Sequence, residues 1–149
     1  MAPILASAEI ARRPEDVFSY VSDPSRLADW QESVVSAHVE GGGPPAQGAK
    51  AITKRRVGRG ERTMTMELTE LAAPSAWTAR GIDGPVRARV RGVVEPLDDG
   101  SRSRVTIELD FEGRGIGKLL VPLLVRPQAK RELPKNMQHL KERLEGSPT

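Results

Sequence analysis

The sequence predicts an α+β fold in which one strand, two short helices and about six antiparallel strands precede a long C-terminal helix. Two observations support this prediction. Apolar and polar residues alternate along several segments between positions 33 and 111, a period typical of half-buried strands. From position 125 onward the apolar residues recur every three or four positions, which is typical of one helix face.

The N-terminal segment predicts one strand and both short helices. Residues 4–10 have the composition of a first strand, and Pro14 stands where a helix can begin. Asp23 is a suitable N-cap and Pro24 a suitable first helical residue, so residues 25–30 predict the second helix. Both helices therefore lie between the first strand and the rest of the sheet.

Glycine-, proline- and aspartate-rich turns divide the middle of the chain into strands. In the clearest strand Val105, Ile107, Leu109 and Phe111 alternate with polar residues, so one side of the strand is apolar. The predicted strands cover residues 33–40, 49–57, 62–71, 76–82, 86–95 and 104–111.

The predicted C-terminal helix presents one apolar face. Its apolar positions are Val125, Ala129, Leu133, Met137, Leu140 and Leu144. Pro122 fits the first turn of this helix. Pro127 and Pro134 each remove a backbone hydrogen bond, so they predict that the helix bends or splits.

Composition indicates one globular domain spanning residues 1–149. The longest apolar stretch, residues 116–125, is about half the length that a transmembrane helix needs, so we expect no membrane span. The opening MAPILASAEI lacks a basic start, and we expect no secretory signal. The absence of cysteine excludes disulfides and thiolate chemistry, and a cytoplasmic location is the expectation.

The charge pattern disfavours nucleic acid as a partner. The net charge is +3, but the 23 basic residues are scattered among 20 acidic ones. Aromatic residues make up only 3% of the chain, too few for a base-stacking platform. An ordinary solvated surface explains the charges better.

The order of these segments resembles the START/Bet v 1-like superfamily (the SRPBCC group), in particular its polyketide cyclase/dehydrase and lipid-transport branch. The similar motifs are RRPEDVFSYVSDPSRLADW (12–30), the Gly-rich loop ending in GAKA (48–51), MELTEL (66–71), GSRSRVTIELDF (100–111) and HLKERLEG (139–146). The resemblance covers essentially the whole chain. It implies a helix-grip fold, in which a curved seven-stranded antiparallel sheet surrounds the C-terminal helix and two short helices after the first strand close one end of a cavity.

Five residues are candidates for contact with a ligand. Met64, Met66, Trp77 and Phe111 should share the concave face, and thioethers and flat rings adapt to irregular apolar ligands. Ordinary core filling explains these four equally well, because a cavity wall and a core wall look alike in sequence. Trp30 could shape the mouth of the cavity, although a Trp at this position more often anchors its helix to the core.

No catalytic residue can be assigned from the sequence. Arg87, Arg89 and Arg91 are interpreted as facing outward, because three desolvated arginines without visible acids would be costly. The directions of Arg55 and Arg80 stay open. An inward arginine is what a cyclase that stabilises an acidic intermediate would need.

Other polar motifs carry weaker signals. His38 and His139 lack a partner at metal-ligand spacing, so we expect no metal and no cofactor. His139 could be a general base only if it faced inward, and Tyr20 is interpreted as a packed tyrosine. The run GRGIGK (113–118) lacks the spacing of a Walker loop, and its glycines are interpreted as a sharp turn into the helix.

The resemblance leaves three functions open, since its members include carriers, cyclases, aromatases and proteins that sequester reactive metabolites. The preferred interpretation is a protein that binds a small hydrophobic, aromatic or polyketide-like ligand, as a carrier, sequestering or resistance-type protein. The alternative is a polyketide cyclase, aromatase or dehydratase, which needs little more than a shaped pocket and one or two polar groups. The third is an interaction protein, compatible with a homodimer, whose pocket is vestigial.

Overall fold

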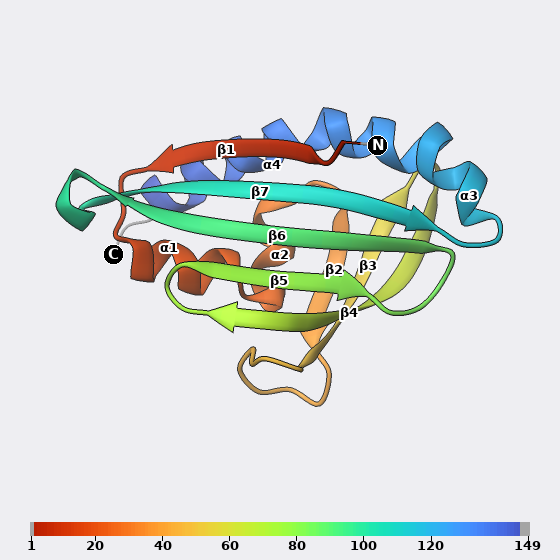
Figure 1. The fold of residues 1–149 in the computed structure, drawn as a ribbon, viewed down its shortest axis with the longest axis horizontal. Coiled ribbons are helices and arrows are strands. Elements are labelled where there is room, and N and C mark those ends of the chain that lie inside the picture. Colours follow the sequence, from red (N-terminus) through yellow and green to blue (C-terminus); the bar gives the residue numbers. More distant parts are fainter. Residues whose placement is uncertain (1, 147–149) are drawn as a thin grey trace.

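The structure is a computed structural model that describes residues 2–146, and it contains the predicted helix-grip arrangement (Figure 1). Seven strands form one antiparallel sheet in the order β1-β7-β6-β5-β4-β3-β2. The strands are β1 (Ile4–Ile10), β2 (Val34–Val39), β3 (Lys50–Val57), β4 (Gly60–Ala72), β5 (Ala76–Gly81), β6 (Val86–Leu97) and β7 (Arg102–Gly113). The helical segments are α1 (Pro14–Val21), η1 (Pro24–Arg26), α2 (Leu27–Trp30), η2 (Asp98–Gly100), α3 (Gly117–Leu120), η3 (Val121–Val125) and α4 (Arg126–Glu145).

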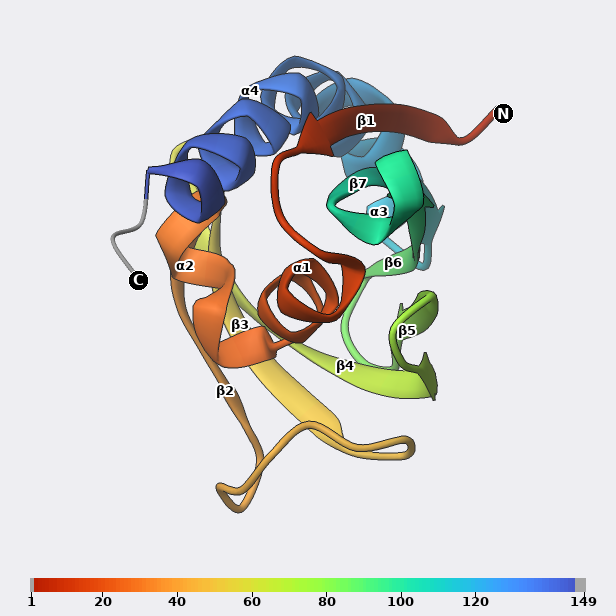
Figure 2. The same cartoon turned by 90° about the vertical axis from the view of Figure 1, so that its left-hand side faces the viewer.

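The sheet curls so strongly that α4 packs along β1 and also reaches the end of β3, where Gln128 hydrogen-bonds to Arg56 and Gly58. Seen end-on, the sheet and α4 form a ring, and α1 stands in one opening of that ring (Figure 2). The long helix packs along β1, the first edge strand, while α2 contacts both α4 and β2. The space inside the ring is therefore closed at this end by the two predicted short helices.

Local sequence explains how these short helices form. Pro14 occupies the start of α1, and Glu15 and Asp16 stand in its first turn, where the positive end of the helix dipole favours them. The Asp23 side chain accepts a hydrogen bond from the Ser25 N–H at 2.9 Å, as predicted for an N-cap. The segment it caps is a 3₁₀ turn, η1, that continues into α2.

The main core lies between the concave face of the sheet, α1 and the inner face of α4. Leu140 is fully buried, and Ile107 and Leu133 are buried beside it, as the two sequence periods predict. Phe18 from α1 meets Trp77 from β5 edge to face, with ring centroids 6.0 Å apart.

The C-terminal helical run departs from the prediction at its prolines. The sequence predicts that the helix bends or splits at Pro134; this residue lies inside α4, which continues through it, so the helix does not split there. Leu133 and Met137 on either side are buried in the core, and their packing holds the helix together there. The irregularity is instead η3, a π-helical turn that ends at Val125, two residues before Pro127. A π-helical turn is wider than an α-helical one, and this width relieves the clash of the proline ring with the preceding turn. Within residues 2–146 we find no helix with the length and apolarity that crossing a bilayer requires.

Contacts between the two ends of the chain fix β1 against α4. The buried Arg126 side chain donates to the Ala2 carbonyl oxygen at 2.6 Å and to the Asp110 carboxylate at 3.3 Å. At the other end of β1 the Ala11 N–H donates to the Glu145 carboxylate at 2.8 Å. Segments that are more than 120 residues apart in sequence are thus joined at both ends of the strand.

Candidate ligand-binding cavity

A cavity of about 170 Å³ lies between the concave face of the sheet and the inner face of α4. An apolar cavity of roughly 150 Å³ is enough to hold benzene, so this space suits a compact ligand built on one or two rings. Residues from α2, from strands β3 to β7 and from α4 line it. The site is thus assembled from most of the chain.

The apolar wall contains all five residues that the sequence singled out. Met64 and Met66 come from β4, Trp77 from β5 and Phe111 from β7, while Trp30 borders the cavity from the end of α2. Strand alternation explains why the first four share a face.

Two irregular features of the neighbouring strands surround Trp77 on this face. A β-bulge between Leu68 and Glu70 changes the parity of β4, so that Leu71 rather than Glu70 pairs beside Trp77. Gly92 is the partner of Trp77 on β6, and a Cβ atom there would lie 2.0 Å from the indole. The ring therefore packs directly onto the backbone of β6.

Trp30 combines a structural position with an unused donor. Its side chain is 2% exposed, which fits the role of an anchor between α2 and the core. Its indole N–H makes no hydrogen bond within the described part of the chain. Buried donors without a partner are rare in folded proteins. The Trp30 indole N–H is therefore an unused hydrogen-bond donor in the cavity wall.

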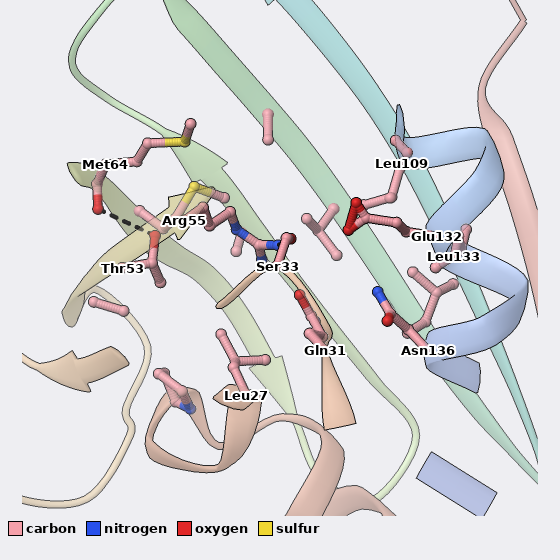
Figure 3. A pocket seen from close by; sticks show the side chains of 18 of the residues that line it. Leu27, Gln31, Ser33, Thr53, Arg55, Met64, Leu109, Glu132, Leu133 and Asn136 are labelled. Carbon is pink, nitrogen blue, oxygen red and sulfur yellow. Dashed lines mark hydrogen bonds between the residues drawn. The ribbon is translucent and has the colours of Figure 1, made fainter. Parts of the chain in front are cut away.

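Polar side chains gather on one side of the cavity, and they come from β3, α4 and the segment between α2 and β2. Figure 3 shows Arg55 pointing into the cavity beside Ser33, with Glu132 extending toward it from α4. The remaining polar residues of the wall are Ser22, Gln31, Thr53, Arg56, Gln128 and Asn136. The Arg55 guanidinium donates to the Ser33 hydroxyl oxygen at 3.4 Å, a long hydrogen bond.

The other polar groups are held in place by the backbone. The Thr53 hydroxyl donates to the Met64 carbonyl oxygen at 3.3 Å. The side-chain oxygen of Asn136 accepts from the Glu32 N–H at 3.0 Å, which fixes the amide of Asn136 at the edge of the site.

Arg55 is the electrostatic centre of the cavity. Burial lowers the pKa of its guanidinium, and the negative charge of Glu132 acts in the opposite direction. Within residues 2–146 no carboxylate lies within 4.0 Å of the Arg55 guanidinium. Because arginine keeps its proton in proteins, the cavity contains a cation whose side chain makes one hydrogen bond among residues 2–146, the long one to Ser33.

The other arginines that the sequence left open lie on the convex face. Arg80 forms an ion pair with Glu67 at 3.1 Å. Arg87, Arg89 and Arg91 alternate with residues of β6 that line the cavity, and their side chains therefore face away from it.

The remaining candidates lie outside the cavity. His38 and His139 are both exposed, and the Tyr20 hydroxyl donates to the Asp29 carboxylate at 3.2 Å. In the described part of the chain no three His, Cys, Asp or Glu side chains cluster as metal ligands. A Cβ atom on Gly117 would lie 1.9 Å from the Pro85 carbonyl oxygen, which supports the interpretation of the glycine run as a tight turn.

With this geometry in place, comparison with known proteins identifies the family. Residues 1–145 match the family described as polyketide cyclase / dehydrase and lipid transport. The chain belongs to this family. Among curated proteins none matches the sequence.

Solved structures of this family's fold align along nearly the whole chain. A Thermus thermophilus protein superposes with a TM-score of 0.78 at 18% identity, covering 99% of each chain. The Zhui aromatase/cyclase from Streptomyces superposes with a TM-score of 0.72 at 14% identity, and the match covers 95% of this chain and 94% of that one. A START superfamily protein from Mycobacterium smegmatis superposes with a TM-score of 0.68 at 16% identity, and the match covers 98% of this chain and 96% of that one. At these identities the likeness concerns the fold.

Proposed function

We propose that this family member binds a small ligand with an apolar, aromatic or polyketide-like body and one anionic or strongly accepting oxygen. The supporting observation is the Arg55 guanidinium, which faces an apolar cavity without an ion-pair partner in the described chain. A ligand carboxylate or enolate would give this cation a charge-assisted hydrogen bond. Such a site matches the usual design of ligand pockets, in which apolar walls supply contact area and a few polar groups set orientation.

The apolar body of the ligand would contact the five wall residues. Trp77 and Phe111 offer flat surfaces, and Met64 and Met66 offer flexible thioethers that adapt to the ligand outline. The unpaired indole N–H of Trp30 could donate to a second ligand oxygen after a small rotation of the ring. In this proposal the protein acts as a carrier or sequestering protein.

A pair of charged groups favours one second candidate, a cyclase or aromatase. Arg55 from β3 and Glu132 from α4 extend toward each other in the cavity (Figure 3). On a poly-β-keto chain, Glu132 would accept a proton from the carbon between two carbonyls. The electron pair would move onto a carbonyl oxygen beside Arg55, and the resulting enolate carbon would attack a second carbonyl to form the ring bond. The alkoxide left on that second carbonyl would take the proton back from Glu132. The similarity to an aromatase/cyclase is consistent with this chemistry.

The test compares two probes of equal shape, 2-naphthoate and 2-methylnaphthalene, by calorimetry and tryptophan fluorescence. We expect Arg55→Met to lower the affinity for 2-naphthoate at least tenfold, which corresponds to about 1.4 kcal/mol of binding free energy, because the carboxylate loses the cation that it contacts. Binding of 2-methylnaphthalene should change little. Arg80→Met is the matched control, since Arg80 lies on the convex face, and it should leave both affinities unchanged.

The two candidate functions give different results. If Arg55→Met binds 2-naphthoate as well as the native protein does, the proposed anchor is wrong. If neither probe binds up to millimolar concentration, a larger panel of polyketide-like ligands must also fail before the carrier function is dropped. For the enzyme, Glu132→Gln should abolish cyclisation of a poly-β-keto thioester while retaining its binding, and native protein that binds this thioester without cyclising it excludes the second candidate.

A further inference from the structure

An exposed apolar surface lies at the end of the molecule opposite α1, on α3 and η3 (Figure 1). Three aliphatic residues form it: Ile116 is 61% exposed, Leu119 63% and Leu123 74%. Their spacing of three and four residues places them on one side of a helical segment. We call these three residues the aliphatic tip.

The opposite side of the same segment forms the end wall of the cavity. Val121 and Val125 are buried against Val86 of β6 in a small cluster that is separate from the main core. Met64 and Phe111 pack against this cluster and also line the cavity. The segment therefore has two apolar sides, and the outer one has no covering element within residues 2–146.

Basic residues lie near the aliphatic tip in the chain. Lys118 stands between Ile116 and Leu119, and Arg114 comes two residues before Ile116. The turn between β3 and β4 is adjacent, because a Cβ atom on Gly58 would lie 3.1 Å from the Leu124 side chain, and this turn carries Arg59. Arg114 is paired with Glu112 at 3.3 Å. Lys118 and Arg59 have no carboxylate within 4.0 Å among the residues described, so their charges are available to a partner.

We propose that α3 and η3 dock this protein onto an anionic lipid surface, with the aliphatic tip among the acyl chains and Lys118 and Arg59 at the headgroups. The combination of an aliphatic side with flanking lysine or arginine is the signature of segments that lie in the membrane interface. Basic side chains next to such a segment gain further from negatively charged lipids.

The shape of the surface favours lipid over protein. Figure 1 shows α3 at the far end of the molecule, beyond the last residues of β7, so the tip projects outward. A projecting tip can enter a fluid bilayer, which adapts to it, whereas a protein partner needs a matching recess. Two copies meeting tip to tip would bury little area compared with a stable dimer. The docking is independent of the ligand proposed above, and either can fail without the other.

Vesicle co-sedimentation tests the proposal. The native protein should bind vesicles of phosphatidylcholine mixed with phosphatidylglycerol, should bind phosphatidylcholine alone less well, and should be released by salt. The double variant Leu119→Ser/Leu123→Ser should bind the anionic vesicles at least about tenfold more weakly, because two inserted side chains lose their apolar surface. Lys118→Glu should weaken binding to anionic vesicles only.

Leu5→Ser is the matched control, because Leu5 is 62% exposed on β1 and lies outside the tip. This control should bind anionic vesicles as the native protein does. All variants should keep the native thermal melting curve, since each altered side chain is exposed. The proposal is overturned if the native protein does not bind anionic vesicles, or if the double variant binds them equally well. Self-association in sedimentation velocity that the double variant abolishes, without vesicle binding, would assign the tip to a second copy and equally overturn it.

Discussion

Replacing Gly92 with alanine should destabilise the fold, because Trp77 already occupies the place of the new methyl group. The added Cβ would lie 2.0 to 2.2 Å from three indole carbons, far inside the roughly 3.5–4.0 Å at which carbon atoms pack. Trp77 is only 5% exposed and meets Phe18 edge to face, so the ring can move away only toward the cavity that it lines, which disrupts its contact with Phe18. Overpacking of this kind costs about 1–3 kcal/mol, and loss of the aromatic pair adds about 0.5–1.5 kcal/mol. We expect a total loss of about 2–4 kcal/mol in the free energy of unfolding.

Urea denaturation followed by circular dichroism measures this loss. Gly60→Ala is the control, because the new Cβ at this strand position would meet only the Val57 carbonyl oxygen at 3.9 Å, an ordinary contact. A double-mutant cycle with Trp77→Leu isolates the clash. In the Trp77→Leu background, Gly92→Ala should lower the free energy of unfolding by much less than it does in the native background. A loss below about 0.5 kcal/mol for Gly92→Ala, or additive effects in the cycle, would refute the packing described here.

Two further predictions concern the helix α4. Leu140→Ala should lower the free energy of unfolding by about 2–5 kcal/mol, because this fully buried side chain would leave a cavity; a loss below about half a kcal/mol in denaturant melts would contradict the docking of α4. The hydrogen bond from Lys141, and then that from the Ala11 N–H, lower the pKa of the Glu145 carboxyl below its ordinary value of 4.5. The stabilisation by this carboxylate is present above pH 4.5 and disappears as the pH falls through the lowered pKa. Melting curves of native protein and Glu145→Gln should therefore differ at neutral pH and converge in acid, and a constant difference would exclude this linkage.

Local patterns predicted the sheet well because each strand has one buried side. The alternation of Val105, Ile107 and Leu109 specified the inner face of β7, and these residues contribute to the core or pack against it. Of the bend or split predicted at Pro134, the split does not occur, because propensity describes an isolated helix whereas tertiary packing holds α4 together.

The polar side of the cavity was harder to predict. The signal for Arg55 was present in β3, since Ala51 and Thr53 share its parity and face inward. It was hidden because Lys54 and a further arginine flank Arg55, so that no face of the strand looked apolar. Glu132 stands directly before Leu133, at the margin of the apolar stripe of α4. Whether such a marginal residue faces a cavity depends on how far the sheet curls around the helix, which no local pattern records.

The ties between β1 and α4 have a consequence for synthesis of the chain on the ribosome. Ala2 and Ala11 hydrogen-bond to Arg126 and Glu145, which the ribosome adds more than 120 residues later. Until α4 has left the exit tunnel, the N-terminal strand has no partner along this side, and the concave face of the sheet stays open to water. Contacts between residues so distant in sequence also slow folding after release. The nascent protein therefore exposes its apolar interior until α4 is available, and a truncation before Arg126 should yield a chain that aggregates or recruits chaperones instead of a smaller stable domain.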